Sequence, residues 1–479
     1  MDLVNRASLL FNRSPALISS GTVYTFRQCD AITSHLALKL HNKGLHPGST
    51  AAILSPNTPA AAFAAMALLR AGIVCAPLNH RFPPEQLGRT LQALHPDLVL
   101  AADPSSMPLK SECRTVSLPE TAAAPSGYAI PIPFDRQNSM DRPVTIIHTS
   151  ASSGTPKAAL HSFGNHWYSA LGAARNMRLE CGDCWLLSLP LFHIGGYAIL
   201  FRALASGSAV AVPDPQEPLE RSLERYPVTH LSLVPTQLFR LLGNPSALPR
   251  LRKLKAVLLG GSAVPAPLLE KSIREGIPIH LSYGSTEMCS QIATTPAPVR
   301  FVQDNSGKPL PWREISIAGD GEILVKGACL FQGYLVGGKP VLSLDDDGWF
   351  HTGDTGSLDE NGNLRVFGRK DNMFISGGEN LHPEEIEQSL GAVKGIEQAL
   401  VVPLPDPEYG QRPAAFIKTA EPGNPPDDAI TEAMLNIAGR LKTPVRYIRV
   451  SGWTTLPGSQ KIDRKWYLRQ IGEENPPWP

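Results

Sequence analysis

The sequence lacks both of the glycine-rich signatures by which many nucleotide-binding proteins are recognised. The spacing G-x-x-x-x-G-K-[ST] of a P-loop does not occur, and neither does the G-x-G-x-x-G of a dinucleotide-binding fold. The second absence disfavours a hydride-transfer enzyme. A nucleotide site in this chain must therefore be built from other residues.

The chain also lacks an excess of either charge. Lysine and arginine together number 44, aspartate and glutamate 43, and the formal net charge is +1. No global field therefore draws the protein to nucleic acid or to an anionic membrane. We expect a small-molecule partner and no nucleic acid, and the sequence leaves the oligomeric state open, a homo-oligomer included.

A membrane-spanning run and a signal peptide are missing from the pattern of apolar residues. The N-terminus has no basic patch followed by a continuous apolar segment. The most apolar stretch, Ala60 to Leu78, contains Arg70 and Pro77 and is typical of a buried helix followed by a strand. We therefore expect no membrane span and a soluble cytoplasmic protein.

The cysteines do not form the pattern of a disulfide framework. There are seven, an odd number, scattered over a long chain. Cys181 and Cys184 form one close pair, but no second pair and no histidine cluster accompanies it. Two reduced thiols in a turn are therefore a better interpretation than a redox or metal half-site.

The length of 479 residues predicts at least two domains. In about the first two thirds, helical and strand-like segments alternate, which predicts a large N-terminal α/β domain with its chemistry in loops at strand ends. The expected helices span about 26–42 and 58–70. The expected strands are Thr50–Leu54, Ile73–Leu78, Trp185–Leu189, Ala209–Val212, His230–Val234, Ala256–Leu259 and Ile279–Ser282.

The pattern changes near Gly307 to short glycine-rich strands such as 322–325, which predicts a β-rich subdomain. After the charged segment 369–371 it returns to helices near 383–390 and 427–441 and a strand near 398–402. This tail of about 110 residues is large enough to fold alone. We expect an N-terminal domain over 1–368 and a C-terminal domain over 369–479.

A segment rich in hydroxyl side chains follows the apolar run 144–147. It contains Thr149, Ser150, Ser152, Ser153, Gly154, Thr155 and Lys157. Glycine and small hydroxyl residues let backbone N–H groups approach phosphate oxygens, and a lysine adds a point charge. Taken alone, the segment is equally well explained as a phosphate-binding loop or as a polar surface loop.

Three further clusters allow two interpretations each. Thr286 and Glu287 offer a hydroxyl for a phosphate and a carboxylate for Mg²⁺, or merely a helix-capping turn. Asp354 suits ribose hydroxyls or a tight turn. Lys461 lies in a Gly/Ser loop near the C-terminus, where most lysines are simply solvated.

In their order, these motifs resemble those of the adenylate-forming superfamily of acyl-CoA synthetases, luciferases and carrier-loading adenylation domains. The family's phosphate loop T-S-G-[ST]-[ST]-G-x-P-K-G corresponds to residues 149–158, with Ala151 and Ala158 in place of two glycines. Y-G-x-T-E is matched by 283–287, T-G-D by 352–354, G-R-x-[DK] by 368–371 and S-G-G-E-N by 376–380. The resemblance covers nearly the whole chain and implies the adenylate-forming fold, with a small mobile α+β C-terminal domain.

The resemblance also implies roles for individual residues, with ATP, Mg²⁺ and CoA as cofactors or co-substrates. The loop from Thr149 to Lys157 would hold the β- and γ-phosphates, Thr286 and Glu287 would serve the α-phosphate and Mg²⁺, and Asp354 and Arg369 would hold the ribose. Lys461 would reach between the carboxylate and the α-phosphate, and Asp371 would be the hinge. Further nucleotide contacts are expected from Gly261, Ser262, Tyr283 and Gly284, and contacts with the pantetheine arm from Gly377 and Gly378.

Within the superfamily, segments 164–167, 191–196, 259–262 and 289–292 look like those of the 2-succinylbenzoate–CoA ligases of menaquinone synthesis. That substrate has a second carboxylate, which a buried cation such as Arg202 would bind. The alternative for Arg202, a helix arginine paired to a structural acid, is equally weighted. His193, Gly260 and Ser285 are expected at the acyl pocket, although His193 could simply pack.

Rival functions remain at this stage. The chain could activate another aromatic or fatty acid, or load a carrier protein, or oxidise its acyl group as luciferases do. A nucleotide-binding protein without catalysis is disfavoured because Lys157, Glu287 and Lys461 are retained. Ser459-Gln460-Lys461 replaces the family's S-G-K, so the loop that carries the lysine is expected to be set differently.

Overall fold

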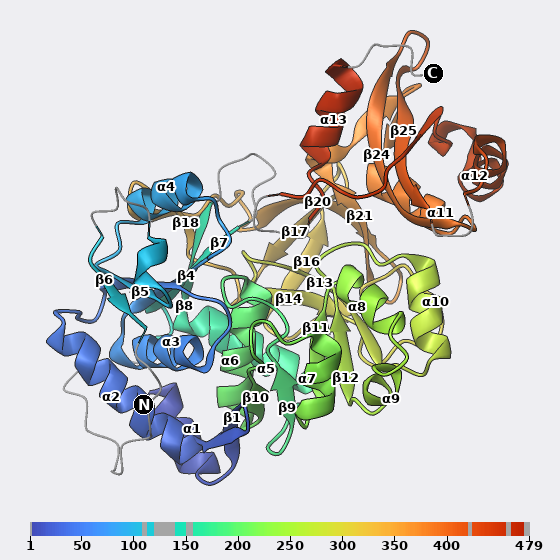
Figure 1. Ribbon diagram of the computed structural model, residues 1–479. Coiled ribbons are helices and arrows are strands. Elements are labelled where there is room, and N and C mark those ends of the chain that lie inside the picture. The colour runs from blue at the N-terminus through green and yellow to red at the C-terminus, as the bar shows by residue number, and fades with distance from the viewer. Residues whose placement is uncertain are drawn as a thin grey trace.

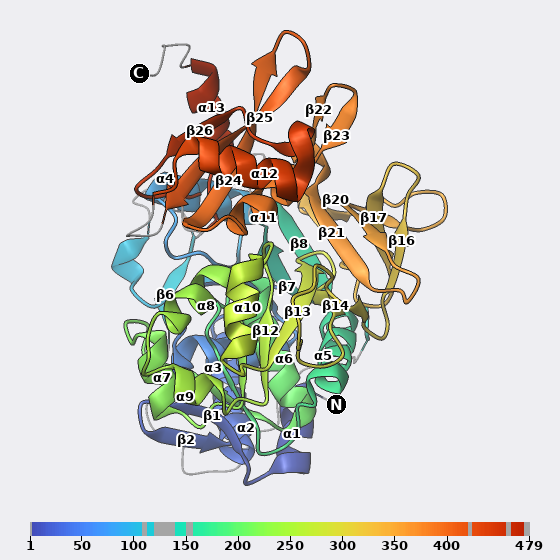
Figure 2. The same cartoon turned by 90° about the vertical axis from the view of Figure 1, so that its right-hand side faces the viewer.

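The computed structural model describes residues 2–107, 113–118, 139–149, 157–419, 424–456 and 461–473. Most of the chain forms a large body, and its last part, in orange and red in Figure 1, forms a smaller unit above it. The chain passes from one to the other just after β21 (Leu364–Arg369). Figure 2 shows the same arrangement from the side, with the smaller unit again above the body.

The first large sheet has nine strands within the described residues, in the order β15-β14-β13-β12-β11-β9-β10-β1-β2. In this order, the neighbouring strands β13, β12, β11, β9, β10 and β1 pair in parallel. Strand β2 at one edge and strands β14 and β15 at the other edge pair in the antiparallel direction. Its members are β1 (Pro15–Ser19), β2 (Thr22–Thr25), β9 (Cys184–Leu186), β10 (Ala209–Ala211), β11 (His230–Leu233), β12 (Ala256–Leu259), β13 (Ile279–Ser285), β14 (Ser290–Thr294) and β15 (Lys308–Pro309). Strands β11 and β12 are buried throughout, which is why they appear in the sequence as continuous apolar runs.

The second large sheet has eight described strands in the order β19-β18-β8-β7-β4-β3-β5-β6. They are β3 (Thr50–Leu54), β4 (Val74–Leu78), β5 (Leu98–Ala101), β6 (Thr115–Ser117), β7 (Pro143–His148), β8 (Ala158–Ser162), β18 (Gly333–Val336) and β19 (Lys339–Val341). Strands β7 and β8 pair as an antiparallel hairpin. The hydroxyl-rich segment from Thr149 to Lys157 therefore connects two strands, and the residues that follow it, Ala158–Ser162, form β8.

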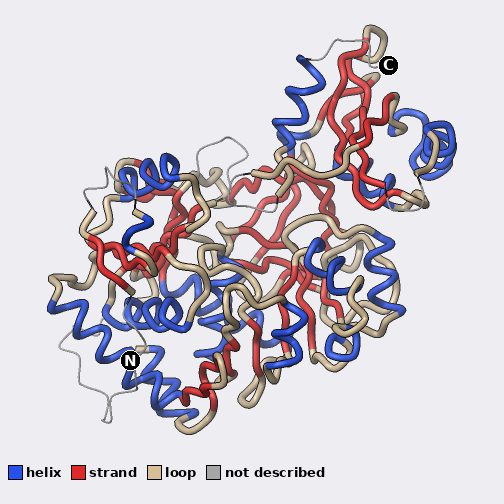
Figure 3. Tube along the Cα trace, viewed as in Figure 1, coloured by secondary structure: helices blue, strands red, loops and turns tan. Residues whose placement is uncertain are grey.

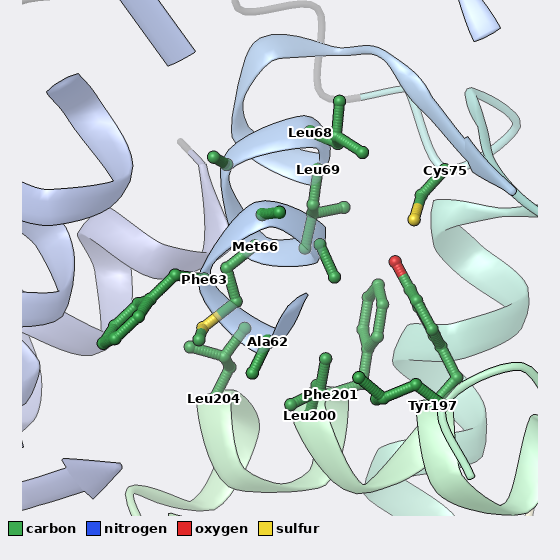
Figure 4. Packing of buried hydrophobic residues seen from close by; sticks show 14 of the residues in the cluster. Ala62, Phe63, Met66, Leu68, Leu69, Cys75, Tyr197, Leu200, Phe201 and Leu204 are labelled. Atoms are coloured by element: carbon green, nitrogen blue, oxygen red, sulfur yellow. The ribbon is translucent and has the colours of Figure 1, made fainter. Parts of the chain in front are cut away.

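Helices fill the space around and between the two sheets, as Figure 3 shows by colour. They are α1 (Leu3–Phe11), α2 (Phe26–Asn42), α3 (Pro59–Ala71), α4 (Pro84–Leu94), α5 (Phe163–Met177), α6 (Ile194–Ser206), α7 (Leu219–Arg225), α8 (Pro235–Leu242), α9 (Leu248–Leu251) and α10 (Ala266–Arg274), with a 3-10 turn at Pro104–Ser106. In Figure 4, Ala62 and Met66 of α3 lie beside Leu200 and Leu204 of α6. One apolar core therefore joins helices that pack on different sheets, and it fixes α6 in the interior.

Local sequence explains the borders of the helices that were predicted. Thr25 and Gln28 form a reciprocal capping box at the start of α2. Thr58 caps α3 in front of Pro59, and Gly72 ends it in the left-handed conformation. The expected helices at 26–42 and 58–70 are confirmed for these reasons.

A β-rich subdomain follows, as expected from the change of pattern near residue 307. Its four-stranded sheet has the order β16-β17-β20-β21, with β16 (Glu314–Ile317), β17 (Glu322–Lys326), β20 (Phe350–Leu358) and β21. All three pairings are antiparallel. Strands β20 and β21 lie directly below the C-terminal unit in Figure 1.

The C-terminal unit combines helices with short sheets. After a 3-10 turn at Lys370–Asn372 come β22 (Phe374–Ser376), β23 (Glu379–Leu381), α11 (Pro383–Gly391), β24 (Ile396–Asp406), β25 (Gly410–Thr419), α12 (Asp427–Lys442), β26 (Arg446–Arg449) and α13 (Arg464–Glu473). Helix α12 is interrupted at Gly439, whose φ is 77°. The sequence did not predict helix α13, because few apolar residues mark its buried face. Two of them, Tyr467 and Ile471, pack on β24 and β25.

The predicted fold class is confirmed: a large α/β domain with a β-rich subdomain is followed by a small α+β domain. All the expected strands are present, with borders shifted by up to a few residues because strand ends depend on their neighbours. The domain boundary at 368/369 stays a prediction. Among the described residues, no helix is long and apolar enough to cross a membrane.

A close backbone contact at the start of α6 gives a test of how this helix is held. A Cβ atom on Gly196 would lie 2.2 Å from the Pro190 carbonyl oxygen, whereas one on Gly195 would meet only the tip of the Leu189 side chain at 3.1 Å. We expect Gly196→Ala to destabilise the protein by about 1–3 kcal/mol through overpacking. Gly195→Ala is the matched control and should be neutral or slightly stabilising. Thermal and urea unfolding measure both, and equal effects would contradict the packing described.

Candidate functional site

Three of the expected site residues, Tyr283, Asp354 and Arg369, meet at the carboxylate of Asp354. Tyr283 Oη, at the end of β13, donates a hydrogen bond to Asp354 Oδ2 at 2.6 Å. Arg369 Nη1 donates to Asp354 Oδ1 at 3.2 Å and to the Thr352 carbonyl at 3.0 Å. Asp354 and Arg369 are directly opposite each other in the β20–β21 pairing. The motifs T-G-D and G-R-x-[DK] therefore come together because they occupy paired positions on adjacent strands.

The Asp354 carboxylate is held in a partly dehydrated setting. Burial raises its pKa, and the hydrogen bond from Tyr283 and the charge of Arg369 oppose that rise. The pKa of Tyr283 is also raised, first by burial and then by the neighbouring Asp354 charge. Tyr283 therefore acts as a neutral hydrogen-bond donor, and Asp354 as an acceptor whose charge depends on its two partners.

Glu287 lies in the turn after β13 and has a partner that the sequence did not reveal. Tyr334 Oη, from β18, donates to Glu287 Oε1 at 2.5 Å. The ammonium of Lys157 lies 5.0 Å from the centre of the Tyr334 ring. Tyr334 thus brings the end of the hydroxyl-rich segment and the Y-G-x-T-E motif to one place. The sequence carried no signal for it beyond a tyrosine in a stretch of short strands.

Glu287 lies in a turn between two strands. It does not lie at the start of a helix, which was the alternative interpretation of the sequence. Strand β13 runs through Ser285, residues 286–289 form a turn, and β14 returns antiparallel. The interpretation of Thr286 as a helix cap is therefore wrong. The Thr286 carbonyl accepts a hydrogen bond from His161 Nε2 at 2.7 Å, which ties the turn to β8.

The hydroxyl-rich segment is described only at its two ends. Thr149 N donates to the Lys157 carbonyl at 2.9 Å, which closes the loop, while Ser150, Ala151, Ser152, Ser153, Gly154 and Thr155 lie outside the described residues. Ala158 pairs with His148 inside the hairpin and is absent from the residues with positive φ. Its replacement of a family glycine therefore needs no unusual backbone conformation.

Lys461 comes from the C-terminal unit and lies over this cluster. Its pKa is lowered by desolvation, an effect opposed by the charges of Asp354 and Glu287 and assisted by that of Arg369. Its side chain is still reached by solvent. Burial also lowers the pKa of His193 to about 4, and the charges of Lys461 and Arg81 add to the effect. His193, at the start of α6, is therefore neutral at pH 7 and within electrostatic range of the lysine.

Arg202, two turns further along α6, is a buried cation. It is 0 % exposed, donates from Nη2 to Ser290 Oγ at 3.1 Å, and lies with its guanidinium carbon 4.8 Å from the centre of the Trp185 ring. No carboxylate of a described residue forms an ion pair with it, and its Nε and Nη1 have no hydrogen-bond partner. Within the described part of the chain, the alternative of a structural acid partner is therefore not supported. Burial, assisted by the charge of Arg313, lowers its pKa to about 9.

The expected glycines have different surroundings. A Cβ on Gly260 would lie 2.7 Å from the Ser282 carbonyl oxygen, and one on Gly284 would lie 2.1 Å from that of Ser290. Both glycines permit backbone contacts beside the motif, whereas Gly261 has a positive φ of 87° and precedes Ser262 in the loop after β12. Ser285 Oγ accepts from Met288 N at 3.2 Å and so closes the turn.

The expected hinge and the second glycine pair belong to the C-terminal unit. Asp371 accepts from Arg369 Nε at 3.3 Å, and the adjacent Lys370 contacts Asp320 and Glu322 of the body at 2.6 and 2.8 Å. Gly377 and Gly378 lie at the tip of the β22–β23 hairpin, where Gly377 N donates to the Tyr409 carbonyl. No described contact joins this tip to the cluster around Asp354.

These contacts define a site that suits a nucleotide polyphosphate. Lys157, Lys461 and Arg369 supply positive charge, Asp354 supplies an acceptor, and the described hydrogen bond of the Glu287 carboxylate engages its Oε1. Among the described residues there is no group of three or more His, Cys, Asp or Glu side chains that would hold a metal by protein ligands alone. A single carboxylate still fits Mg²⁺, which is usually held by one or two carboxylates together with water and substrate phosphates.

Comparison with protein families agrees with this geometry. A family model described as AMP-binding enzyme matches residues 6–335, and one described as AMP-binding enzyme C-terminal domain matches residues 385–454. The chain belongs to the AMP-binding enzymes. Like them, it has the nucleotide-site motifs in the large domain and a separate small domain after them.

Curated relatives and solved structures refine the comparison. The chain is 36% identical over 459 residues to the 2-succinylbenzoate–CoA ligase of Salmonella typhimurium, covering 95% of this chain and 94% of the relative. The corresponding ligase of Geobacillus kaustophilus is 32% identical, with 93% of each chain covered. The o-succinylbenzoate CoA synthetase of Bacillus subtilis, solved in complex with the acyl-adenylate intermediate OSB-AMP, superposes with a TM-score of 0.85 at 29% identity, with 97% of each chain covered.

The unpaired charge of Arg202 leads to a prediction about stability. Removing a buried charge that has no partner relieves a desolvation penalty, so we expect Arg202→Met to raise the free energy of unfolding by about 1–3 kcal/mol. The lost contact with Trp185 offsets part of this gain, by about 2 kcal/mol or less.

Arg70 provides a matched control for this substitution. It is also buried, but it is paired with Asp30 and, at 3.4 Å, with Asp2. We expect Arg70→Met to destabilise the protein by about 3–5 kcal/mol, because Asp30 is left buried without its partner. Urea and thermal unfolding of the ligand-free variants measure both changes. A destabilisation of the Arg202 variant as large as that of the Arg70 variant would show that the guanidinium has an internal partner.

Proposed function

We propose that this protein is an ATP-dependent acid–CoA ligase that converts 2-succinylbenzoate, ATP and CoA to 2-succinylbenzoyl-CoA, AMP and pyrophosphate. The observation that carries the proposal is the buried Arg202, which has no acid partner among the described residues. A substrate with two carboxylates has one to activate and one to place against such a cation. The extensive similarity to 2-succinylbenzoate–CoA ligases supports the same substrate.

The first half-reaction brings two anions together. A carboxylate oxygen of the acid attacks the α-phosphorus of ATP, the bond from that phosphorus to the bridging oxygen breaks, and pyrophosphate leaves an acyl-adenylate behind. The site must place positive charge where negative charge builds in the transition state. Lys461 is assigned this role between the carboxylate and the α-phosphate, and its electrostatic contact with Asp354 and Glu287 supports the assignment.

The remaining nucleotide contacts follow from the same cluster. We assign the β- and γ-phosphates to the segment that ends at Lys157, the ribose to Asp354 and Arg369, and the α-phosphate to Thr286. Glu287 would hold Mg²⁺, which, when bound, supplies positive charge shared between phosphate oxygens. Tyr334 would then keep the Glu287 carboxylate in a fixed orientation, since its hydroxyl occupies one of the two oxygens.

The second half-reaction needs a different arrangement of the two domains. The sulfur of CoA attacks the acyl carbon, the thiol proton is released, and AMP leaves. We assign residues 369–479 to a domain that turns about Asp371 and exchanges Lys461 for the glycine hairpin at Gly377 and Gly378. Cys29, Cys75, Cys181, Cys184, Cys289 and Cys329 are free thiols, and a reaction that needs the free thiol of CoA suits a reducing compartment, so we place the enzyme in the cytoplasm.

A panel of acids tests the proposed function. Purified protein is incubated with ATP, Mg²⁺, CoA and each acid, and both AMP and thioester are measured. We expect both products with 2-succinylbenzoate and much less with benzoate, coumarate or fatty acids. AMP with these acids but not with 2-succinylbenzoate would keep the reaction class and reject the substrate. AMP without thioester would favour an enzyme that loads a carrier protein.

The role of Lys461 predicts a division between the half-reactions. We expect Lys461→Ala to slow acyl-adenylate formation by about 10²–10³-fold, because it removes charge from the transition state. Thioester formation from supplied acyl-adenylate should remain nearly unchanged. Lys465, exposed in α13, gives the control: Lys465→Ala should leave both steps unaltered. An equal loss of both steps in the Lys461 variant would contradict the assignment.

A further inference from the structure

The turn between β13 and β14 contains a backbone conformation that L-amino acids rarely adopt. Cys289 has a φ of 55° and Ser290 a φ of 100°. The region near φ 100° is accessible to glycine without strain, whereas a side chain at Cβ makes it unfavourable. A serine at this position is therefore less favourable for the stability of the fold than a glycine. Its presence is explained if its hydroxyl group has a role that glycine cannot perform.

The conformation is imposed by contacts on several sides. Ser169 Oγ of α5 donates to the Cys289 carbonyl at 2.5 Å, and His166 Nδ1 lies 3.2 Å from Cys289 Sγ. His166 is fixed in turn by Thr145 Oγ1, 2.7 Å from its Nε2. On the other side, the Ser290 carbonyl approaches Gly284 so closely that a Cβ would not fit between them. The turn is thus determined by packing from α5, β7 and β13.

The Ser290 hydroxyl has one notable partner, the guanidinium of Arg202. The hydrogen bond from Arg202 Nη2 to Ser290 Oγ measures 3.1 Å, and it is the only hydrogen bond described for this guanidinium. Ser290 itself is 9 % exposed, so water does not readily replace it. The long arginine side chain has few other polar contacts to fix its orientation, and the Trp185 ring constrains it only from one face.

We propose that Ser290 is a positioning residue for Arg202: its hydroxyl, aimed by the strained turn, fixes the guanidinium so that Nε and Nη1 face the second carboxylate of the acid. The inference rests on the proposed function, since it takes Arg202 as the group that binds this carboxylate. Because Ser290 follows Glu287 by only three residues, the same turn sets the positions of the metal ligand and of the acid-binding cation. Specificity for a dicarboxylic acid would therefore depend on a residue that touches neither ATP nor the reacting carboxylate.

Three substitutions separate the hydroxyl from the backbone strain. Ser290→Ala removes the hydroxyl and keeps the strain, Ser290→Gly removes both, and Ser290→Thr keeps the hydroxyl. We expect the alanine and glycine variants to raise the KM for 2-succinylbenzoate about 10-fold, as loss of one hydrogen bond to a charged group does, with kcat and the KM for ATP within twofold of wild type. The threonine variant should keep a KM close to that of wild type.

The glycine variant gives a readout that a merely structural role would not produce. We expect its thermal midpoint to equal or exceed that of wild type while its affinity for the acid falls. Ser20, at a φ of 44° in the turn between β1 and β2, offers the matched control. Ser20→Gly also relaxes a serine at positive φ and should leave the KM for the acid unchanged.

A monocarboxylic analogue completes the test. With 4-oxo-4-phenylbutanoate, which lacks the carboxylate on the ring, the alanine variant and wild type should have the same kcat/KM, because no second carboxylate reaches Arg202. An unchanged KM for 2-succinylbenzoate in both the alanine and the glycine variants would overturn the role of Ser290. If Arg202→Met abolishes the preference for the dicarboxylic acid in the same assays, the proposed function stands although Ser290 fails. Absence of 2-succinylbenzoate turnover by wild type overturns the proposed function and this inference together.

Discussion

The buried charge of Arg202, which has no acid partner among the described residues, is the constraint on which the arrangement of the surrounding side chains depends. A buried guanidinium without an acid is costly, and it persists only where the fold holds it firmly. Helix α6 is fixed by the apolar packing against α3 and by the backbone contact at Gly196, so Arg202 cannot move out to solvent. The fold thus holds a buried cation in its interior, which in the proposed function binds the second carboxylate of the acid.

The candidate nucleotide site also depends on positively charged side chains, and these come from separate parts of the chain. Lys157 ends the segment between β7 and β8, Arg369 ends β21, and Lys461 belongs to the small domain. Each is near a carboxylate or an aromatic ring, so the ligand-free protein does not suffer strong repulsion among the cations. A polyphosphate can therefore replace these contacts at moderate cost, and in the proposed mechanism Lys461 leaves the site when the small domain turns.

Sequence reasoning succeeded where the determinants are local and failed where they are made by packing. The strand borders at β3 and β12 and helix α2 were predicted because continuous apolar runs and the four-residue spacing of Ile32, Leu36 and Leu40 specify them. The meeting of Asp354 with Arg369 followed only from a resemblance, although paired strands explain it. Tyr334 escaped notice because its contact with Glu287 joins strands of different sheets. The folded structure likewise determines whether Arg202 has an acid partner and which backbone conformation Ser290 adopts.

The difference between features set by local sequence and features set by packing affects how the specificity for the acid can change on this fold. The motifs proposed to bind ATP are readable in the sequence because they resemble the motifs of the adenylate-forming family. The proposed acid site involves instead side chains on α6 and just after β13, whose positions depend on α5 and on the β7–β8 hairpin. A change in the acid can therefore be accommodated by altering Arg202 or its supports while Lys157, Glu287 and Asp354 stay in place. In this chain the two proposed sites nevertheless share residues 286–290, so the proposal implies that substitutions there are limited by the demands of both ligands at once.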